Sequence, residues 1–159
     1  MPAITPFLWF DNQLEEALEF YAKVFDDVTV TARSHGTADT PGGMPPGTLL
    51  SASFTIAGSA FMGLNGGPRV TFNDAVSFFV SCKDQEEVDR YWEGLLDGGT
   101  PTACGWITDR FGVTWQIVPD GLLELLSGPT PEAAGRATRA MLTMQRLDLE
   151  TIRRANAGE

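Results

Sequence analysis

The sequence predicts an α+β fold: two βαβββ modules that form cupped mixed sheets with helices on the outside, followed by a C-terminal helical tail. The main observation is an internal repeat, in which a buried strand, a capped amphipathic helix and three further strands occur twice. The second is that 159 residues, of which 43% are apolar and 20% charged, can bury a sizeable core. We expect the first module at residues 1–68, the second at 69–121 and the tail at 122–159, all within one structural domain.

Each module contains a helix whose start and apolar face are visible in the sequence. Asn12 is the expected N-cap of the first helix, and Glu15, three residues later, would complete a capping box. Asp84 and Glu87 have the same roles in the second, because a shift of 72 residues aligns the two starts. Apolar residues at helical spacing follow: Leu14, Ala17, Leu18, Tyr21 and Phe25 in the first helix, and Val88, Tyr91, Trp92 and Leu95 in the second.

The strands are predicted from apolar and β-branched runs bounded by turn residues. They are expected at 4–10, 28–33, 48–56 and 59–64 in the first module, and at 75–82, 100–104, from Trp106, and at 113–118 in the second. Ala57-Gly58 and Asp109–Gly112 are the expected hairpin turns, with Asp109 and Arg110 at the surface. Residues 35–47 are rich in Gly and Pro and predict a mobile loop that begins at His35.

The tail should form helices. Thr130-Pro131-Glu132 combines an N-cap, a proline at the first helical position and an acid in the first turn, and Asp148 is a candidate cap for a last short helix. An apolar stripe formed by Ala133, Ala137, Met141 and Met144 favours packing against the domain or a partner subunit. A methionine-lined ligand groove is the alternative interpretation.

Composition excludes several classes of partner. The net charge of −10, without a basic run, argues against nucleic acid. No apolar stretch reaches the roughly 18 residues of a membrane span, and the N-terminus lacks the features of a signal peptide. We therefore expect a soluble, cytoplasmic protein. Cys82 and Cys104 form no CxxC pattern, so we favour reduced core cysteines over a disulfide between them.

Five segments in family order carry a resemblance: PFLWFDNQLEEALEFYAKVF (6–25), FMGLNGGP (61–68), VSFFVSCKDQEEVDRYWEGL (76–95), CGWITDRFGVTWQIVP (104–119) and AMLTMQRLDLETIRRA (140–155). Together with the duplicated βαβββ unit, they resemble the PhnB-like branch of the vicinal-oxygen-chelate superfamily, which includes glyoxalase I, extradiol dioxygenases and bleomycin- and fosfomycin-resistance proteins. Members of this branch are often labelled 3-demethylubiquinone-9 3-methyltransferase-like. The resemblance implies a pocket inside each cupped sheet and, frequently, a homodimer that completes the pockets.

The resemblance also implies where metal-using relatives hold their ligands. The first and last strands of each module would supply one ligand each, which here places them at Pro6, Met62, Phe78 (or Ser77, if the register slips by one) and Gln116. Divalent sites of this kind need imidazole or carboxylate groups, and the single histidine, His35, lies elsewhere. We therefore expect no metal and no cofactor.

Gln116 is the polar residue that best fits ligand recognition. If Thr114, Gln116 and Val118 face the cup while Trp115 and Ile117 face the helices, Gln116 is an amide in an apolar cavity. It would either orient a ligand or bind a neighbouring backbone group or water, because an unpaired buried amide costs about 1–3 kcal/mol. The candidate ligand-binding residues are Gln116, Trp9, Met62, Phe78, Trp106 and His35, with core packing as the alternative for each aromatic residue and a solvated loop position as that for His35. Asn65-Gly66-Gly67-Pro68 is interpreted as a strand-ending turn rather than a phosphate loop.

The expected function is binding of a small organic ligand in an apolar pocket, by a homodimer whose catalytic status the sequence leaves open. A methyltransferase acting on a quinone precursor is one alternative, although the first strand is not followed by the glycine-rich turn typical of nucleotide-type cofactors. A metal-dependent lyase or dioxygenase is another; the few carboxylates near its sheet elements, chiefly Asp74 and Asp120, are interpreted as turn residues. The third is a non-catalytic interaction protein that dimerises through its tail.

Overall fold

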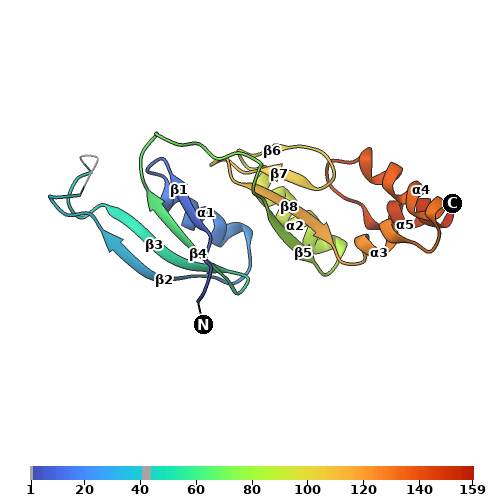
Figure 1. Cartoon of the computed structure of the whole chain (residues 1–159), viewed down its shortest axis with the longest axis horizontal. Coiled ribbons are helices and arrows are strands. Elements are labelled where there is room, and N and C mark those ends of the chain that lie inside the picture. Colours follow the sequence, from blue (N-terminus) through green and yellow to red (C-terminus); the bar gives the residue numbers. More distant parts are fainter. Residues whose placement is uncertain (1, 41–43) are drawn as a thin grey trace. The chain divides into compact units, whose positions relative to one another are not determined.

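The computed structural model describes residues 2–40 and 44–159. The chain divides into two compact units, one ending at Phe72 and the other comprising Asn73–Glu159. Each unit contains one four-stranded sheet, and the helices of the tail belong to the second unit (Figure 1). The expected α+β class with two βαβββ modules and a helical tail is confirmed.

The first unit is a mixed sheet with one helix on it. Its elements are β1 (Phe7–Phe10), α1 (Leu14–Val24), β2 (Val28–His35), β3 (Leu49–Ile56) and β4 (Ser59–Asn65). The strand order is β1-β4-β3-β2, with β1 parallel to β4 and the other pairs antiparallel. Ala57 and Gly58 both have positive φ angles, as the tight β3–β4 hairpin requires.

The core of this unit lies between α1 and one face of the sheet. All five predicted residues of the helical stripe are buried. Alternate strand residues meet them, among them Phe10, Phe54 and Phe61, and the rings of Phe54 and Phe61 stack at 5.6 Å between centroids. Gly63 must lack a side chain, because a Cβ there would lie 2.4 Å from a methyl carbon of Leu14.

The start of α1 differs from the prediction. Asn12 does not cap the helix: it has a left-handed φ of 56°, and the N-cap position is Gln13, which makes no side-chain cap bond. The cap comes instead from a residue distant in sequence, because the Asn65 Oδ1 accepts a hydrogen bond of 2.8 Å from the backbone N–H of Leu14. The Asn65 Nδ2 donates to the Leu49 carbonyl at 2.9 Å, so this buried amide joins α1, β3 and β4.

The second unit repeats this arrangement. It contains β5 (Phe78–Cys82), α2 (Gln85–Leu96), β6 (Thr100–Pro101), β7 (Trp106–Thr108) and β8 (Thr114–Pro119), in the order β5-β8-β7-β6. Phe7 pairs with Met62 in the first sheet and Phe79 pairs with Gln116 in the second. The first strands are therefore offset by 79 − 7 = 72 residues and the last by 116 − 62 = 54, as the sequence alignment of the modules predicted.

Two turns of the second unit are fixed by carboxylates. Asp84 caps α2 as predicted, accepting from the Glu87 N–H at 2.9 Å. Asp109 lies in the predicted turn, but the expectation that it is a surface residue is wrong, since only 4% of it is exposed. Its carboxylate accepts hydrogen bonds from the backbone N–H groups of Phe111 and Val113 and from the Trp115 indole N–H, all at 2.9–3.0 Å.

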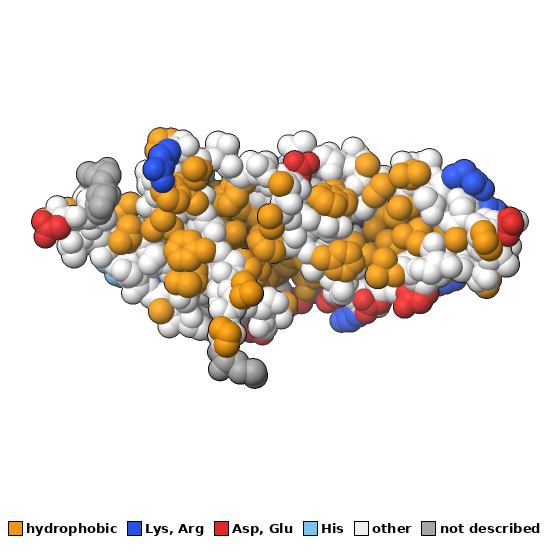
Figure 2. All heavy atoms as spheres, viewed as in Figure 1, with side chains coloured by type: hydrophobic (Ala, Val, Ile, Leu, Met, Phe, Trp, Pro, Cys, Tyr) orange, Lys and Arg blue, Asp and Glu red, His pale blue; other side chains and the backbone are white. Residues whose placement is uncertain are grey.

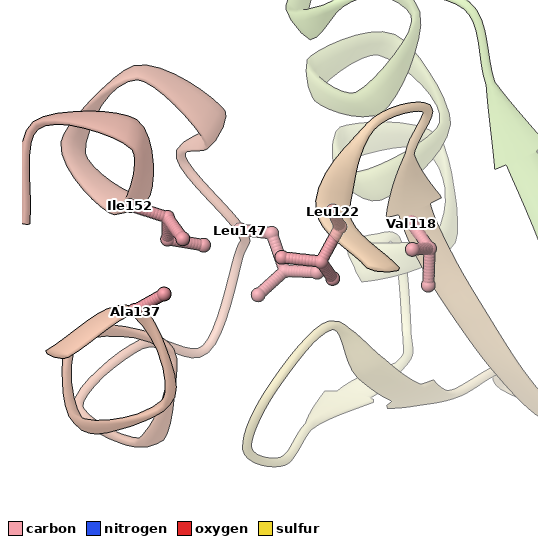
Figure 3. Packing of buried hydrophobic residues seen from close by; sticks show 5 residues of the cluster. All are labelled: Val118, Leu122, Ala137, Leu147 and Ile152. Atoms are coloured by element: carbon pink, nitrogen blue, oxygen red, sulfur yellow. The ribbon is translucent and has the colours of Figure 1, made fainter. Parts of the chain in front are cut away.

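The tail forms three helices: α3 (Leu122–Ser127), α4 (Pro131–Leu142) and α5 (Leu149–Ala157). Thr130 and Asp148 cap α4 and α5 as predicted. Figure 3 shows the side chains that join the tail to β8, namely Val118, Leu122, Ala137, Leu147 and Ile152. Met141 and Met144 pack against this cluster, which supports packing as the role of the predicted apolar stripe.

A single side chain connects the tail to α2. The Gln85 Nε2 donates to the Leu147 carbonyl at 2.8 Å, and the Gln85 Oε1 accepts from the Leu149 N–H at 3.0 Å. In the described part of the chain, no helix is both long and apolar enough to cross a membrane.

Candidate functional site

The candidate site is a cavity of about 840 Å³ in the first unit. Trp9 and Leu64 form part of its wall and pair in register on β1 and β4. Both alternate with residues that are buried on the α1 side, so they belong to the opposite, open face of the sheet. The remaining described lining residues are Asn12, Thr40, Met44, Pro45, Thr48, Leu50, Asn65, Gly66, Gly67, Pro68 and Arg69.

Trp9 is held in place from several directions. Its indole N–H donates to the Gly67 carbonyl at 2.9 Å. Its ring lies so close to Gly66 that a Cβ on that residue would approach the indole to 2.1 Å. The guanidinium carbon of Arg69 lies 5.1 Å from the centre of a Trp9 ring, within the range of a cation–π interaction. The aromatic wall of the cavity is therefore rigid.

The turn after β4 is consequently structural and also part of the site. The Asn65 side chain is occupied by α1 and β3, and the Gly66 N–H donates to the Phe10 carbonyl. These bonds agree with the predicted strand-ending turn. Gly66 and Gly67 bring the backbone close to Trp9, which is why side chains are absent at both positions.

Segments on both sides of residues 41–43 contribute to the cavity. Thr40, Met44 and Pro45 line it, and residues 41–43 of the expected loop lie outside the described residues. His35 does not begin this loop: it is the last residue of β2, pairs with Leu49, and is exposed. It is not among the described residues that line the cavity.

The second unit places Gln116 in a different setting. Its Nε2 donates to the Ser77 hydroxyl at 2.8 Å, so its hydrogen-bond partner is a side chain rather than a backbone group. Phe78 pairs with Trp115, and their rings lie 5.4 Å apart. Because Trp115 is buried and adjacent strand residues alternate, Phe78 and Gln116 belong to opposite faces of the sheet.

The six predicted ligand-binding residues are thus distributed over two units. Trp9 lines the cavity. Met62 lies two residues before Leu64 on the same face and is half-buried, outside the described lining. Trp106 pairs with Gln116 on neighbouring strands of the second sheet, where it is half-buried. Ligand contact by these residues stays a prediction.

Arg69 and Asn12 are the lining residues that the sequence analysis did not recognise as such. Arg69 follows the NGGP turn directly, so its proximity to an expected binding face was a usable signal. Asn12 resembled a helix cap, and only its left-handed conformation places it differently.

The groups at the positions where metal-using relatives hold ligands do not fit a divalent ion. The Pro6 carbonyl already accepts from the Met62 N–H at 2.9 Å, and Gln116 binds Ser77. A thioether, a hydroxyl and an amide lack the basic nitrogen or carboxylate that such ions require. Over residues 2–40 and 44–159, no cluster of three or more His, Cys, Asp or Glu side chains is suited to a metal ion.

The cysteines provide no reactive centre beside the cavity. Both are free thiols, Cys82 buried and Cys104 half-buried. Burial, reinforced by the charge of Glu87, raises the pKa of Cys82 to about 12. This thiol is therefore neutral and a poor nucleophile at neutral pH.

Comparisons with known proteins agree with this architecture. A family model described as 3-demethylubiquinone-9 3-methyltransferase matches residues 2–118. A PhnB protein from Bacillus cereus is 32% identical with a TM-score of 0.66, and the match covers 74% of this chain and 99% of that one. No curated protein matches.

Two more distant structures share the fold. One is a protein from Pseudomonas aeruginosa, 20% identical, with a TM-score of 0.59 and coverage of 75% of this chain and 98% of that one. The other is a fosfomycin resistance protein from Listeria monocytogenes, 17% identical, with a TM-score of 0.56 and coverage of 80% and 98%.

Paired βαβββ modules define the fold of the vicinal-oxygen-chelate superfamily. The chain belongs to the PhnB-like branch of this superfamily, the family described as 3-demethylubiquinone-9 3-methyltransferase. The family match ends at residue 118, so the helices of the tail lie beyond it.

Proposed function

We propose that this PhnB-like protein binds a small organic ligand in the cavity of its first unit, without the metal tetrad used by other members of the superfamily. The cavity carries the proposal, because a concave space of about 840 Å³ walled by a fixed indole and aliphatic side chains is typical of small-molecule sites. Whether the bound ligand reacts is left unassigned. The cytoplasmic location expected from the sequence stays a prediction.

The experiment that tests this proposal fills the cavity. A Leu64→Trp substitution adds bulk to a half-buried wall residue on the open face, where it does not disturb the packing against α1. We expect fragments that bind the wild-type protein in saturation-transfer NMR to lose affinity by about tenfold or more, equivalent to ~1.4 kcal/mol.

Thr29→Trp is the matched control, since Thr29 is exposed on β2 and does not line the cavity. It should bind the same fragments as the wild type. Equal binding by Leu64→Trp and the wild type, or no binding by the wild type of any fragment in an apolar and aromatic set, would contradict the proposal.

The family description favours a second candidate, methyl transfer. Both sheets are mixed βαβββ sheets rather than the doubly wound parallel sheet that usually holds nucleotide-type cofactors, and β1 leads to Asp11-Asn12 without a glycine-rich turn. Calorimetric binding of S-adenosylmethionine at micromolar affinity would favour this candidate over simple ligand binding.

A further inference from the structure

The charge of the cavity wall distinguishes it from the rest of the first unit. Arg69 is the only charged side chain among the described residues that line the cavity. Up to residue 72 the sequence has seven carboxylates and only three basic residues. Arg69 nevertheless forms no ion pair with any described residue, and its guanidinium lies over Trp9 instead.

This arrangement leaves the arginine prepared for an anion. A guanidinium stacked on an indole loses part of its conformational freedom before a ligand arrives, which lowers the entropic cost of binding. Its planar set of N–H donors matches the two oxygens of a carboxylate. The other polar side chains of the wall, such as Asn12 and Thr48, are neutral and do not compete for it.

We propose that the cavity selects a small organic anion with a flat apolar body and a single carboxylate group. Arg69 binds the carboxylate, and Trp9, Leu50 and Leu64 contact the body. One guanidinium balances one negative charge, so a carboxylate fits better than a doubly charged phosphate. Charges elsewhere on this acidic protein interfere little, since exposed charges more than about 10 Å away are screened at 0.1 M salt. The inference rests on the proposed function and names its ligand class.

The test compares two probes that differ only in charge: 2-naphthoate and its neutral analogue 2-naphthamide. Isothermal titration with the full chain should show the naphthoate bound about tenfold more tightly, because charge-assisted hydrogen bonds are the stronger kind. Arg69→Gln should remove this preference while the naphthamide binds as before. Raising salt from about 50 to about 500 mM should weaken only the naphthoate.

Arg33→Gln is the matched control, since Arg33 is an exposed arginine on β2 outside the cavity lining. It should leave the affinity for both probes unchanged. Equal binding of the two probes to the wild type, or an unchanged preference in Arg69→Gln, would overturn the inference and leave ligand binding intact. Absence of binding of either probe, while other fragments bind and Leu64→Trp excludes them, would also overturn the inference alone. Only the failure of all fragments removes the proposed function itself.

Discussion

Asp109 shows how one buried side chain organises a turn. Its carboxylate accepts from two backbone N–H groups of the 109–113 turn and from the Trp115 indole on β8. Hydrogen bonds to a charged acceptor contribute more than neutral ones, and a donor left unpaired in the interior adds its own cost. Turn geometry and the position of the largest buried side chain of the second unit are therefore coupled.

We expect Asp109→Ala to destabilise the protein by about 2–4 kcal/mol, because the Val113 N–H and the indole N–H would both lose this acceptor. Asp109→Asn should cost less, since one amide oxygen can still serve the two backbone donors. Urea unfolding measures both values. Equal stability of the alanine variant and the wild type would show that water or another group replaces the carboxylate.

The sequence predicted those residues whose role depends on their immediate neighbours. Asp84, Thr130 and Asp148 are N-caps because each precedes its own helix by a fixed spacing, which is visible in the sequence. Asn12 has the same local pattern but is not a cap, because Asn65, 51 residues beyond Leu14 in the chain, supplies the acceptor. Local spacing cannot reveal such a competitor.

The site follows the same division. Trp9 was predicted because strand alternation fixes its face, whereas the contribution of Arg69 depends on how the turn after β4 folds back on β1. His35 was assigned to a loop because its neighbours are glycine-rich, yet pairing with Leu49 extends β2 through it. Residues governed by long-range pairing were the ones missed.

At the level of elements, the two modules differ in what occupies equivalent positions. Gln13 and Gln85 correspond under the 72-residue offset, and both stand at the start of a helix. Gln13 is exposed and forms no side-chain cap bond. Gln85 binds the backbone at Leu147 and Leu149, where the tail enters α5.

We expect Gln85→Ala to loosen the tail by about 1–2 kcal/mol, because the backbone groups of Leu147 and Leu149 would lose these two hydrogen bonds. Hydrogen exchange should accelerate in α5 more than in β8. Gln13→Ala, the corresponding change in the first module, should leave exchange in the tail unchanged. Equal protection of α5 in both variants would mean that the apolar cluster of Figure 3 holds the tail by itself.

At the scale of the whole molecule, apolar side chains lie on the surface of both units (Figure 2). Phe7 and Phe79 occupy equivalent register positions on β1 and β5, and are 52% and 51% exposed. Two large aromatic side chains in water at the same place of a duplicated sheet favour burial by a partner. This observation supports the homodimer that the family resemblance implies, which we retain as a proposal.

Sedimentation velocity should therefore give the mass of a dimer at tens of micromolar, on the order of the concentrations used for such measurements. The double variant Phe7→Gln/Phe79→Gln should shift the protein toward monomer. Leu142→Gln, a substitution of a residue 61% exposed on α4, should not. A wild-type protein that sediments as a monomer, or a double variant that stays fully dimeric, would exclude this interface.

The two offsets between the modules have a further meaning. The strands that pair in parallel correspond at 72 residues in one case and 54 in the other, so the second copy is 72 − 54 = 18 residues shorter between them. The first copy uses its longer β2–β3 arm to supply Thr40, Met44, Pro45 and Thr48 to the cavity. The second copy has only the short strands β6 and β7 there, and carries the three added helices. The duplicated halves have thus specialised: one gained the means to enclose a guest, and the other became the anchor for an appendage.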